Sequence, residues 1–432
     1  MDALTRWGST LLMLCAGSIA NAASPEQTAG ALLDHLQADK TAAAEAMFTP
    51  EMAKAVPAAQ LRSIWQSLGD LRQRGAARSS AHEGMTIVVV PLTFAKGTLD
   101  AQIVVDAQQR VAGLMFKPAA APAAPAPAPP ADAPYRESSF EVPTATGALP
   151  GTLAMPTGRG PFPAVVLVHG SGPQDRDETT GPNRPFLDVA RGLAAQGIAV
   201  LRYDKRTKVR PQDFVDRNFT MDDETTDDAV AALTALAGAP DIDPDHLYVM
   251  GHSQGGMLAP RIAQHSDKVA GLILWSAPAR SLLTILPEQN RYLLGLRGGI
   301  SAEEQAFLDK LETQIAAARG TADVPAKDLP LGLPASYWRA FEQVDPVADA
   351  RALKQPIMLL QGGRDIQVID TDWQLWTRGL SRERSVSFRD YPSLNHLGIP
   401  GQGPGTVEEY ASPGHVLPQL IDDVAHWIKE QS

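Results

Sequence analysis

Cysteine is almost missing from this sequence, since Cys15 is the only one in 432 residues. It lies in a short apolar run, residues 10–19, between Arg6 and the tripeptide Ala20-Asn21-Ala22. A positive residue, a short apolar run and an A-x-A site together predict a signal peptide over residues 1–22. Its removal would leave a mature chain without cysteine, which excludes disulfides, a thiol nucleophile and a cysteine-bound metal.

The sequence also has fewer basic than acidic residues, 38 against 49, and lacks long apolar runs. The formal net charge is -11 and the isoelectric point is near 5.3, so neither nucleic acid nor an anionic membrane surface is expected as a partner. The apolar run near the start is too short to span a bilayer, and no membrane insertion is expected after cleavage. We therefore expect a periplasmic or secreted bacterial protein. The alternative for residues 1–22 is a buried N-terminal helix.

Alternating alanine and proline mark a boundary in the chain at residues 118–134. Such a stretch forms neither a helix nor a sheet ladder, and we expect an extended, semi-rigid linker. A chain of 432 residues is long enough for more than one domain. The sequence therefore predicts two units, residues 24–117 and residues 135–432.

The first unit shows helical and then strand-like patterns. Apolar residues recur at intervals of three and four in residues 25–37 and 58–71, which predicts helices, and residues 85–117 predict two or three antiparallel strands. This is the pattern of a small α+β accessory domain. Its histidines, His35 and His82, are isolated and indicate no chemistry.

The second unit alternates strands and helices. Residues 162–170 form a nearly continuous apolar run, as expected for a parallel strand that is buried on both faces. Further strands are predicted at residues 198–204, 246–251, 269–278, 356–363 and 385–391, and helices at residues 185–197, 222–238, 256–265 and 417–431. The prediction is an α/β fold with a doubly wound, mostly parallel sheet, opened by an antiparallel hairpin at residues 138–157.

Residues 281–345 interrupt this alternation between two predicted strands. An insertion at this point lies over the carboxyl ends of the strands, so we interpret it as a helical cap that shapes a pocket and excludes water. We expect its aromatic residues Tyr337, Trp338 and Phe341 to fill space in that pocket. An inert excursion of the chain is the alternative.

The segment Gly251-His252-Ser253-Gln254-Gly255 fits the pattern G-x-S-x-G. This pattern is typical of a serine on a sharp strand-to-helix turn, where small neighbours let the backbones approach. A plain glycine-rich turn is the alternative for so short a motif. Because a strand is predicted before it and a helix after it, we predict that Ser253 is a nucleophile.

A base and an acid should follow strand ends, because ligands of open α/β sheets bind there. His396 follows the last predicted strand in a loop rich in glycine and proline, and His415 is the alternative. Asp365 comes directly after a buried strand, whereas Asp370 and Asp372 resemble a helix start. The order Ser253, Asp365, His396 is the one expected for this topology. Histidine would move the serine proton, and the carboxylate would fix the imidazole tautomer.

Two backbone N–H groups are needed to stabilise a developing oxyanion. One should belong to Gln254, and the other to Ser171, or to Gly172, in the loop after the first parallel strand. That loop continues through the charged residues 175–178. We favour an ion-pair network that pins the loop, joined by residues 202–207, over a charged wall beside the site.

The segments HGSGPQDRDETTGPNRPF, GIAVLRYDKRT, GHSQGG and GRDIQV together resemble the α/β-hydrolase superfamily, and within it a bacterial group of capped serine carboxylesterases with a small N-terminal domain. The resemblance implies carboxylesterase activity, with Ser253, Asp365 and His396 as the triad and the loop at Ser171 completing the oxyanion hole. It covers nearly all of the mature chain.

The expected partner is therefore a small-molecule carboxylic ester with a short acyl group, and neither a cofactor nor a metal is expected. Related folds also host peptidases, thioesterases and acyltransferases, so the natural substrate stays open. A non-catalytic binding protein of the cell envelope on a hydrolase scaffold is the alternative of another class. The oligomeric state and the role of the first domain also stay open.

Overall fold

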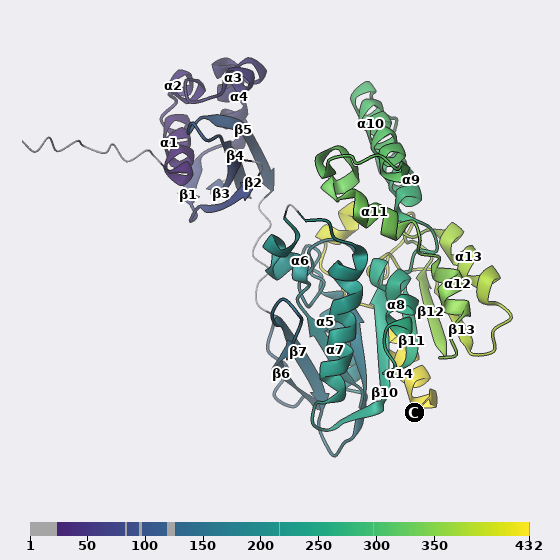
Figure 1. The fold of residues 1–432 in the computed structure, drawn as a ribbon. Helices are drawn as coiled ribbons and strands as arrows, with labels where there is room; N and C mark the ends of the chain where they lie inside the picture. Colours follow the sequence, from purple (N-terminus) through teal and green to yellow (C-terminus); the bar gives the residue numbers. More distant parts are fainter. Residues whose placement is uncertain are drawn as a thin grey trace, which may run out of the picture. The chain divides into compact units, whose positions relative to one another are not determined.

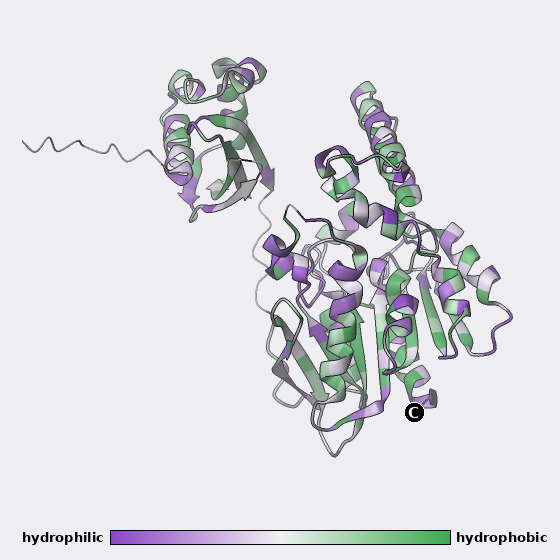
Figure 2. Cartoon of the chain, in the orientation of Figure 1, coloured by the Kyte–Doolittle hydropathy of each residue, from purple (hydrophilic) through white to green (hydrophobic). Residues whose placement is uncertain are grey.

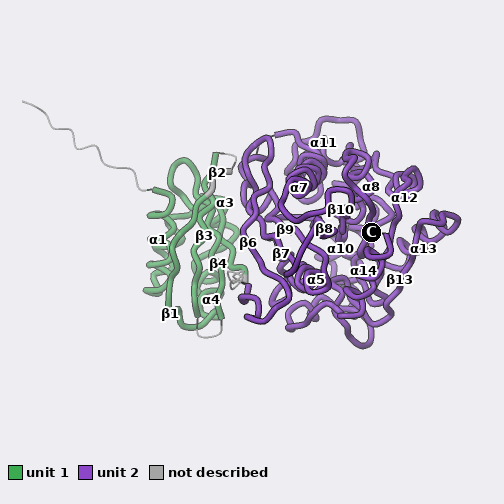
Figure 3. Tube along the Cα trace, turned by 90° about the horizontal axis from the view of Figure 1, so that it is seen from below, with its two compact units in different colours: residues 1–124 green, residues 125–432 purple. Residues whose placement is uncertain are grey.

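The computed structural model describes residues 24–431 except residues 83, 95–96, 119–125, 216 and 297. The chain divides into two compact units, residues 1–124 and residues 125–432 (Figure 3). This division falls within the expected linker. The expected signal peptide and part of the linker lie outside the described residues. Within the described ranges, no helix has both the length and the apolar character needed to cross a membrane.

The first unit packs short helices on an antiparallel sheet. Its helices are α1 (Pro25–Gln37), α2 (Thr41–Glu45), α3 (Pro50–Ala55) and α4 (Ala58–Leu68). Its strands are β1 (Leu71–Arg74), β2 (Arg78–His82), β3 (Met85–Phe94), β4 (Gly97–Val105) and β5 (Val111–Pro118), in the order β1-β3-β4-β5 with β2 also pairing with β3. The sequence predicted α1, α4 and the last three strands, but not α2, α3, β1 or β2.

The second unit is built on a mixed, mostly parallel sheet (Figure 1). Its strands are β6 (Tyr135–Val142), β7 (Leu149–Pro156), β8 (Phe162–Val168), β9 (Ala199–Tyr203), β10 (Ile242–His252), β11 (Val269–Trp275), β12 (Ile357–Gly362) and β13 (Val386–Tyr391). They follow the order β13-β12-β11-β10-β8-β9-β7-β6. Strands β8 to β13 pair in parallel, and the hairpin β6-β7 is antiparallel. The predicted fold class is thereby confirmed.

Helices cover both faces of this sheet because successive side chains of a buried strand point to opposite sides. Val165 and Leu167 of β8 pack with α5 (Pro185–Ala194) and α14 (Pro418–Gln431). Val166 and Val168 pack on the opposite face. The helices of that face are α7 (Asp227–Ala237), α8 (Gln254–Gln264), α12 (Pro346–Arg351) and α13 (Asp370–Leu380). Figure 2 shows the resulting apolar strands between amphipathic helices.

The insertion that was predicted at residues 281–345, between β11 and β12, is largely helical. It contains α9 (Leu282–Gly295), α10 (Ala302–Arg319) and α11 (Ala335–Phe341). Leu283, Leu311 and Trp338 of these helices pack against Met257 and Leu258 of α8 in one buried cluster. The insertion therefore stands over the helix that begins directly after Ser253 (Figure 1).

Short elements complete the unit. They are α6 (Arg206–Val209), the 3-10 helices η1 (Pro211–Phe214), η3 (Ala326–Asp328), η4 (Pro330–Gly332) and η5 (Val407–Ala411), and the π-helical turn η2 (Asp222–Thr226) before α7. Most of them lie in the loops at the carboxyl ends of the parallel strands, where the residues of the candidate site also lie.

Candidate active site

Ser253 occupies the sharp turn between β10 and α8. Its backbone has φ 52° and ψ -121°, a conformation that residues with a side chain rarely adopt. The flanking glycines are required by close backbone contacts. A Cβ on Gly251 would lie 2.2 Å from the carbonyl oxygen of Gly255, and a Cβ on Gly255 would lie 2.2 Å from that of Val168. The G-x-S-x-G pattern therefore follows from packing that exposes the serine on a tight turn.

His396 and Asp365 form a buried pair. The Nδ1 atom of His396 lies 2.8 Å from Oδ2 of Asp365, and the two side chains are 4% and 0% exposed. The other carboxylate oxygen accepts the backbone N–H groups of Gln367 and Val368 at 2.8 and 2.9 Å. Since the carboxylate accepts a hydrogen bond at Nδ1, a neutral imidazole carries its proton there and keeps Nε2 as a base.

The alternative histidine, His415, lies elsewhere. Its side chain is 86% exposed and pairs with Asp188 of α5. The two aspartates assigned to a helix start are at the beginning of α13, and Asp372 there forms an ion pair with Arg280. The structure therefore brings together Asp365 and His396, as predicted, and leaves His415 outside.

His252, which precedes the serine, connects the elbow to two loops. Its Nδ1 atom lies 2.8 Å from Oε2 of Glu178, and its Nε2 atom lies 2.9 Å from the backbone carbonyl oxygen of His396. Oε1 of Glu178 accepts the N–H of Gly170 at 2.6 Å. Burial opposes both charges, but the facing groups outweigh it, so the pKa of His252 is raised and the pKa of Glu178 is lowered.

A second buried pair holds the other side of Gly170. The ammonium of Lys205 lies 2.9 Å from Oε1 of Glu224 and donates a hydrogen bond of 2.9 Å to the carbonyl oxygen of Gly170. Oε2 of Glu224 accepts hydrogen bonds from Tyr337 of the cap and from the side chain of Gln254. Burial, and then the charge of Glu224, raise the pKa of Tyr337 well above its ordinary value.

These contacts fix the peptide between Gly170 and Ser171. A Cβ on Gly170 would lie 3.2 Å from the Cβ of Ser253, so this loop packs directly against the serine. The carbonyl of that peptide is held by Lys205, and its N–H belongs to Ser171. Sequence reasoning missed Lys205, Glu224 and the contact of Glu178 with His252, because nothing in the local pattern predicts which loops meet.

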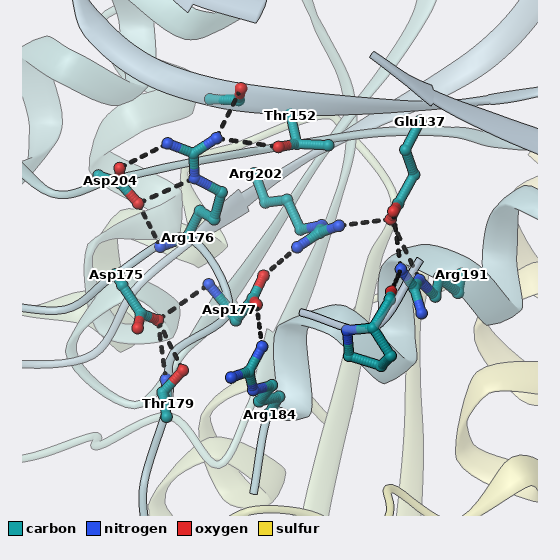
Figure 4. A network of polar contacts seen from close by, with 12 residues as sticks. Glu137, Thr152, Asp175, Arg176, Asp177, Thr179, Arg184, Arg191, Arg202 and Asp204 are labelled. Atoms are coloured by element: carbon teal, nitrogen blue, oxygen red, sulfur yellow. Dashed lines mark hydrogen bonds and ion pairs between the residues drawn. The ribbon is translucent and has the colours of Figure 1, made fainter. Parts of the chain in front are cut away.

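The charged segment after Ser171 forms the expected network (Figure 4). Arg202 of β9 contacts both Asp177 of the loop and Glu137 of β6, while Arg176 binds Asp204 at 2.6 Å. Arg184 and Arg191 add further ion pairs to Asp177 and Glu137 at 3.3 and 2.8 Å. The network pins the loop to the sheet, as we favoured, except that Glu178 points instead to His252.

Ser253 opens into a cavity of about 210 Å³ under the cap. Ser171 and Gln254 line it from the sheet side, and Leu282, Ile285, Leu286 and Gln289 line it from α9. Of the cap aromatics expected there, Phe341 lines the cavity, whereas Trp338 is buried in the cap cluster and Tyr337 binds Glu224. The prediction for Tyr337 and Trp338 is therefore wrong.

Among the described residues, no group of three or more His, Cys, Asp or Glu side chains is arranged to hold a metal.

Comparison with known proteins gives matches to both units. Residues 29–114 match the model of a family described as a protein of unknown function (DUF3887). Residues 165–428 match the model of the family described as Alpha/beta hydrolase family, a range that includes Ser253, Asp365 and His396. Esterase EstD of Thermotoga maritima is 36% identical over 408 residues, which cover 93% of this chain and 95% of that relative.

Solved structures match more distantly. Est1E from Butyrivibrio proteoclasticus is 17% identical with a TM-score of 0.44, and the match covers 68% of this chain and 98% of that chain. An esterase of Pyrococcus furiosus is 15% identical with a TM-score of 0.46, over 70% of this chain and 94% of that chain.

Proposed function

This chain belongs to the alpha/beta hydrolase family and is an esterase, and from that premise we propose that it cleaves carboxylic esters through an acyl-enzyme on Ser253. The observation that carries the proposal is the buried contact between Asp365 and His396, in the unit that exposes Ser253 at a strained turn facing a cavity. A scaffold that only binds a ligand has no need of this arrangement.

In the proposed mechanism, Nε2 of His396 takes the proton of Ser253 as the serine oxygen attacks the ester carbonyl. Asp365 holds the ring and stabilises its charged form. The negative oxygen of the tetrahedral intermediate accepts hydrogen bonds from the backbone N–H groups of Gln254 and Ser171. His396 then donates its proton to the leaving alcohol, and water releases the acid from Ser253 by the same steps.

We expect short acyl groups to be preferred, because the cavity at Ser253 is about 210 Å³ and α9 and Phe341 close it. An apolar cavity of about 150 Å³ is large enough for benzene, so this one holds a small acyl group and little more. Aryl esters whose acyl group has about two to six carbons should be turned over best. Each methylene that fits adds to transition-state binding until the acyl group fills the cavity. A p-nitrophenyl ester series with a maximum at twelve carbons or more would contradict this.

The serine mechanism is tested by a fluorophosphonate probe and by amide and thioester substrates. The wild-type protein should be labelled at Ser253, and Ser253→Ala should not be labelled. Amides should be much poorer substrates than esters, because their cleavage demands a well-placed proton donor for the leaving amine. Aminoacyl anilide rates that match ester rates would favour a peptidase, and an unlabelled wild-type protein would favour the binding scaffold.

Export to the periplasm or medium belongs to the proposal and depends on residues 1–22 alone. The expected result is a mature N-terminus near Ala23, read by N-terminal sequencing of protein from the periplasmic fraction. A full-length chain found with the cytoplasmic fraction would contradict it.

A further inference from the structure

A second cavity, of about 260 Å³, adjoins the one at Ser253. The two share three lining residues, Ile285, Gln289 and Gln367. Nε2 of Gln289 on α9 donates a hydrogen bond of 2.6 Å to the backbone carbonyl oxygen of Gln367. The shared residues therefore lie where the two spaces meet, and this hydrogen bond holds two of them together.

The lining of the second cavity is suited to a neutral group. Its apolar surface comes from Ile285, Ile366, Ile369, Pro404 and the glycines of two loops. Its charged residues are already paired. Arg280 binds Asp372 and Glu288 at 2.8 Å each, and Arg364 contacts Glu409. Because these pairs satisfy the charges, the cavity offers no unpaired ion for a charged ligand, and an alkyl or aryl group fits it better.

The position of the cavity decides which part of an ester it would take. The residues 363–367 that line it include Asp365, the partner of His396, whereas Ser171 and Gln254 line the cavity at Ser253. In ester cleavage the carbonyl oxygen faces the oxyanion donors. The leaving oxygen must face the histidine that protonates it. The alcohol part of the ester therefore extends toward the histidine and aspartate side.

We infer that this second cavity binds the alcohol part of the substrate as a neutral alkyl or aryl group, while the short acyl group stays at Ser253. The inference rests on the proposed function. An apolar cavity of about 150 Å³ takes benzene, so this larger space takes a benzyl or hexyl group. The substrate class is then an ester of a short acid with a larger apolar alcohol.

A matched pair of substitutions separates the two cavities. Ile369 lines only the second cavity and is 38% exposed at the residue before α13, so Ile369→Trp fills that space without disturbing the core. Leu286 lines only the cavity at Ser253, so Leu286→Trp fills the acyl side instead. Two substrate series report on the two sides. Methyl, hexyl and benzyl butyrate vary the alcohol, and methyl acetate, butyrate and hexanoate vary the acid.

We expect Ile369→Trp to lower the ratio of kcat/KM for benzyl butyrate to that for methyl butyrate by about tenfold or more, because a lost methylene-sized contact already changes discrimination about tenfold. Its ratio of methyl hexanoate to methyl acetate should stay as in the wild-type protein. Leu286→Trp should give the opposite pair of results. Unchanged melting temperatures of both variants establish that the fold is kept.

Two results would overturn the inference. If Ile369→Trp changes the acid series instead, the second cavity takes the acyl group; if it changes neither ratio, the cavity takes no part of the substrate. Failure of the proposed function looks different, because the wild-type protein would then turn over neither series, or Ser253→Ala would keep the wild-type rates.

Discussion

Replacing Lys205 with methionine would remove an ammonium group that two partners share. The side chain of Lys205 is 2% exposed and that of Glu224 is 7% exposed, so solvent screens this pair very little. Removing one partner of a buried ion pair costs about 3–5 kcal/mol. Glu224 keeps the hydroxyl of Tyr337 and the amide of Gln254 as donors, which favours the lower end of this range. The carbonyl of Gly170 also loses its donor, for about 1 kcal/mol more.

The same change should lower turnover, for a reason that is separate from stability. Lys205 holds the carbonyl of the peptide whose N–H, on Ser171, is the proposed oxyanion donor. Once that carbonyl is released, the peptide can rotate, and the N–H group of Ser171 no longer points at the oxyanion. Loss of one such donor lowers kcat by about 10²–10³-fold. KM should change far less, because the donor acts mainly on the charge of the transition state.

The double variant Lys205→Met/Glu224→Gln separates the two effects. Glutamine can still accept the hydrogen bonds of Tyr337 and Gln254 but leaves no uncompensated charge, so much of the lost unfolding free energy should return. The carbonyl of Gly170 still has no partner, so kcat should stay low. Urea unfolding and p-nitrophenyl butyrate kinetics give both quantities. Recovery of kcat together with stability, or a single variant with wild-type values for both, would refute the reasoning.

Three other predictions concern the elbow, the second histidine and the unit boundary. Ser253→Ala should keep its circular dichroism spectrum and lose ester turnover by a factor on the order of 10⁴ or more, and retained turnover would remove Ser253 from the mechanism. The raised pKa of His252 means that its pair with Glu178 stabilises the fold below the ordinary histidine pKa of 6.5 and loses that effect as the pH rises through the folded value. Between pH 6 and 9 the melting temperature should therefore fall more steeply for the wild-type protein than for His252→Gln. Parallel curves of melting temperature against pH would contradict this. A chain that begins at Pro125 keeps the carbonyl of Pro127, which Arg191 binds at 2.6 Å, and should hydrolyse esters like the full chain; a folded but inactive product would give the first unit a part in the site.

The sequence was sufficient for the sheet and for the residues at its strand ends. Continuous apolar runs such as residues 162–168 reveal buried parallel strands, and in this topology the residues after such strands must meet at one edge. Together with the G-x-S-x-G motif and the chain order, that rule selected Ser253, Asp365 and His396. Strands β1 and β2 could not be predicted, because Leu71–Arg74 and Arg78–His82 show no apolar alternation.

The ion pairs Glu178–His252 and Lys205–Glu224 depend on tertiary structure, so no local pattern in the sequence predicts them. Glu178 and Lys205 lie in loops after different strands, and each finds its partner in a third segment. The cap aromatics show the same limit. Tyr337, Trp338 and Phe341 were all expected in the pocket, but which of them reaches the cavity depends on how α11 rotates against α8.

The arginine network of Figure 4 also bears on how this unit opens. Strand β6 stands at the end of the sheet order, and a strand at an edge is among the first segments to fray during local unfolding. Arg202 joins Glu137 of that strand to Asp177 of the loop beside the serine. Fraying of β6 would therefore remove Glu137 from Arg202 and weaken one of the contacts that hold this loop. Because the chain before Tyr135 contacts the unit through the carbonyl of Pro127 on Arg191, a mechanical pull on that chain would reach this contact first and strand β6 next.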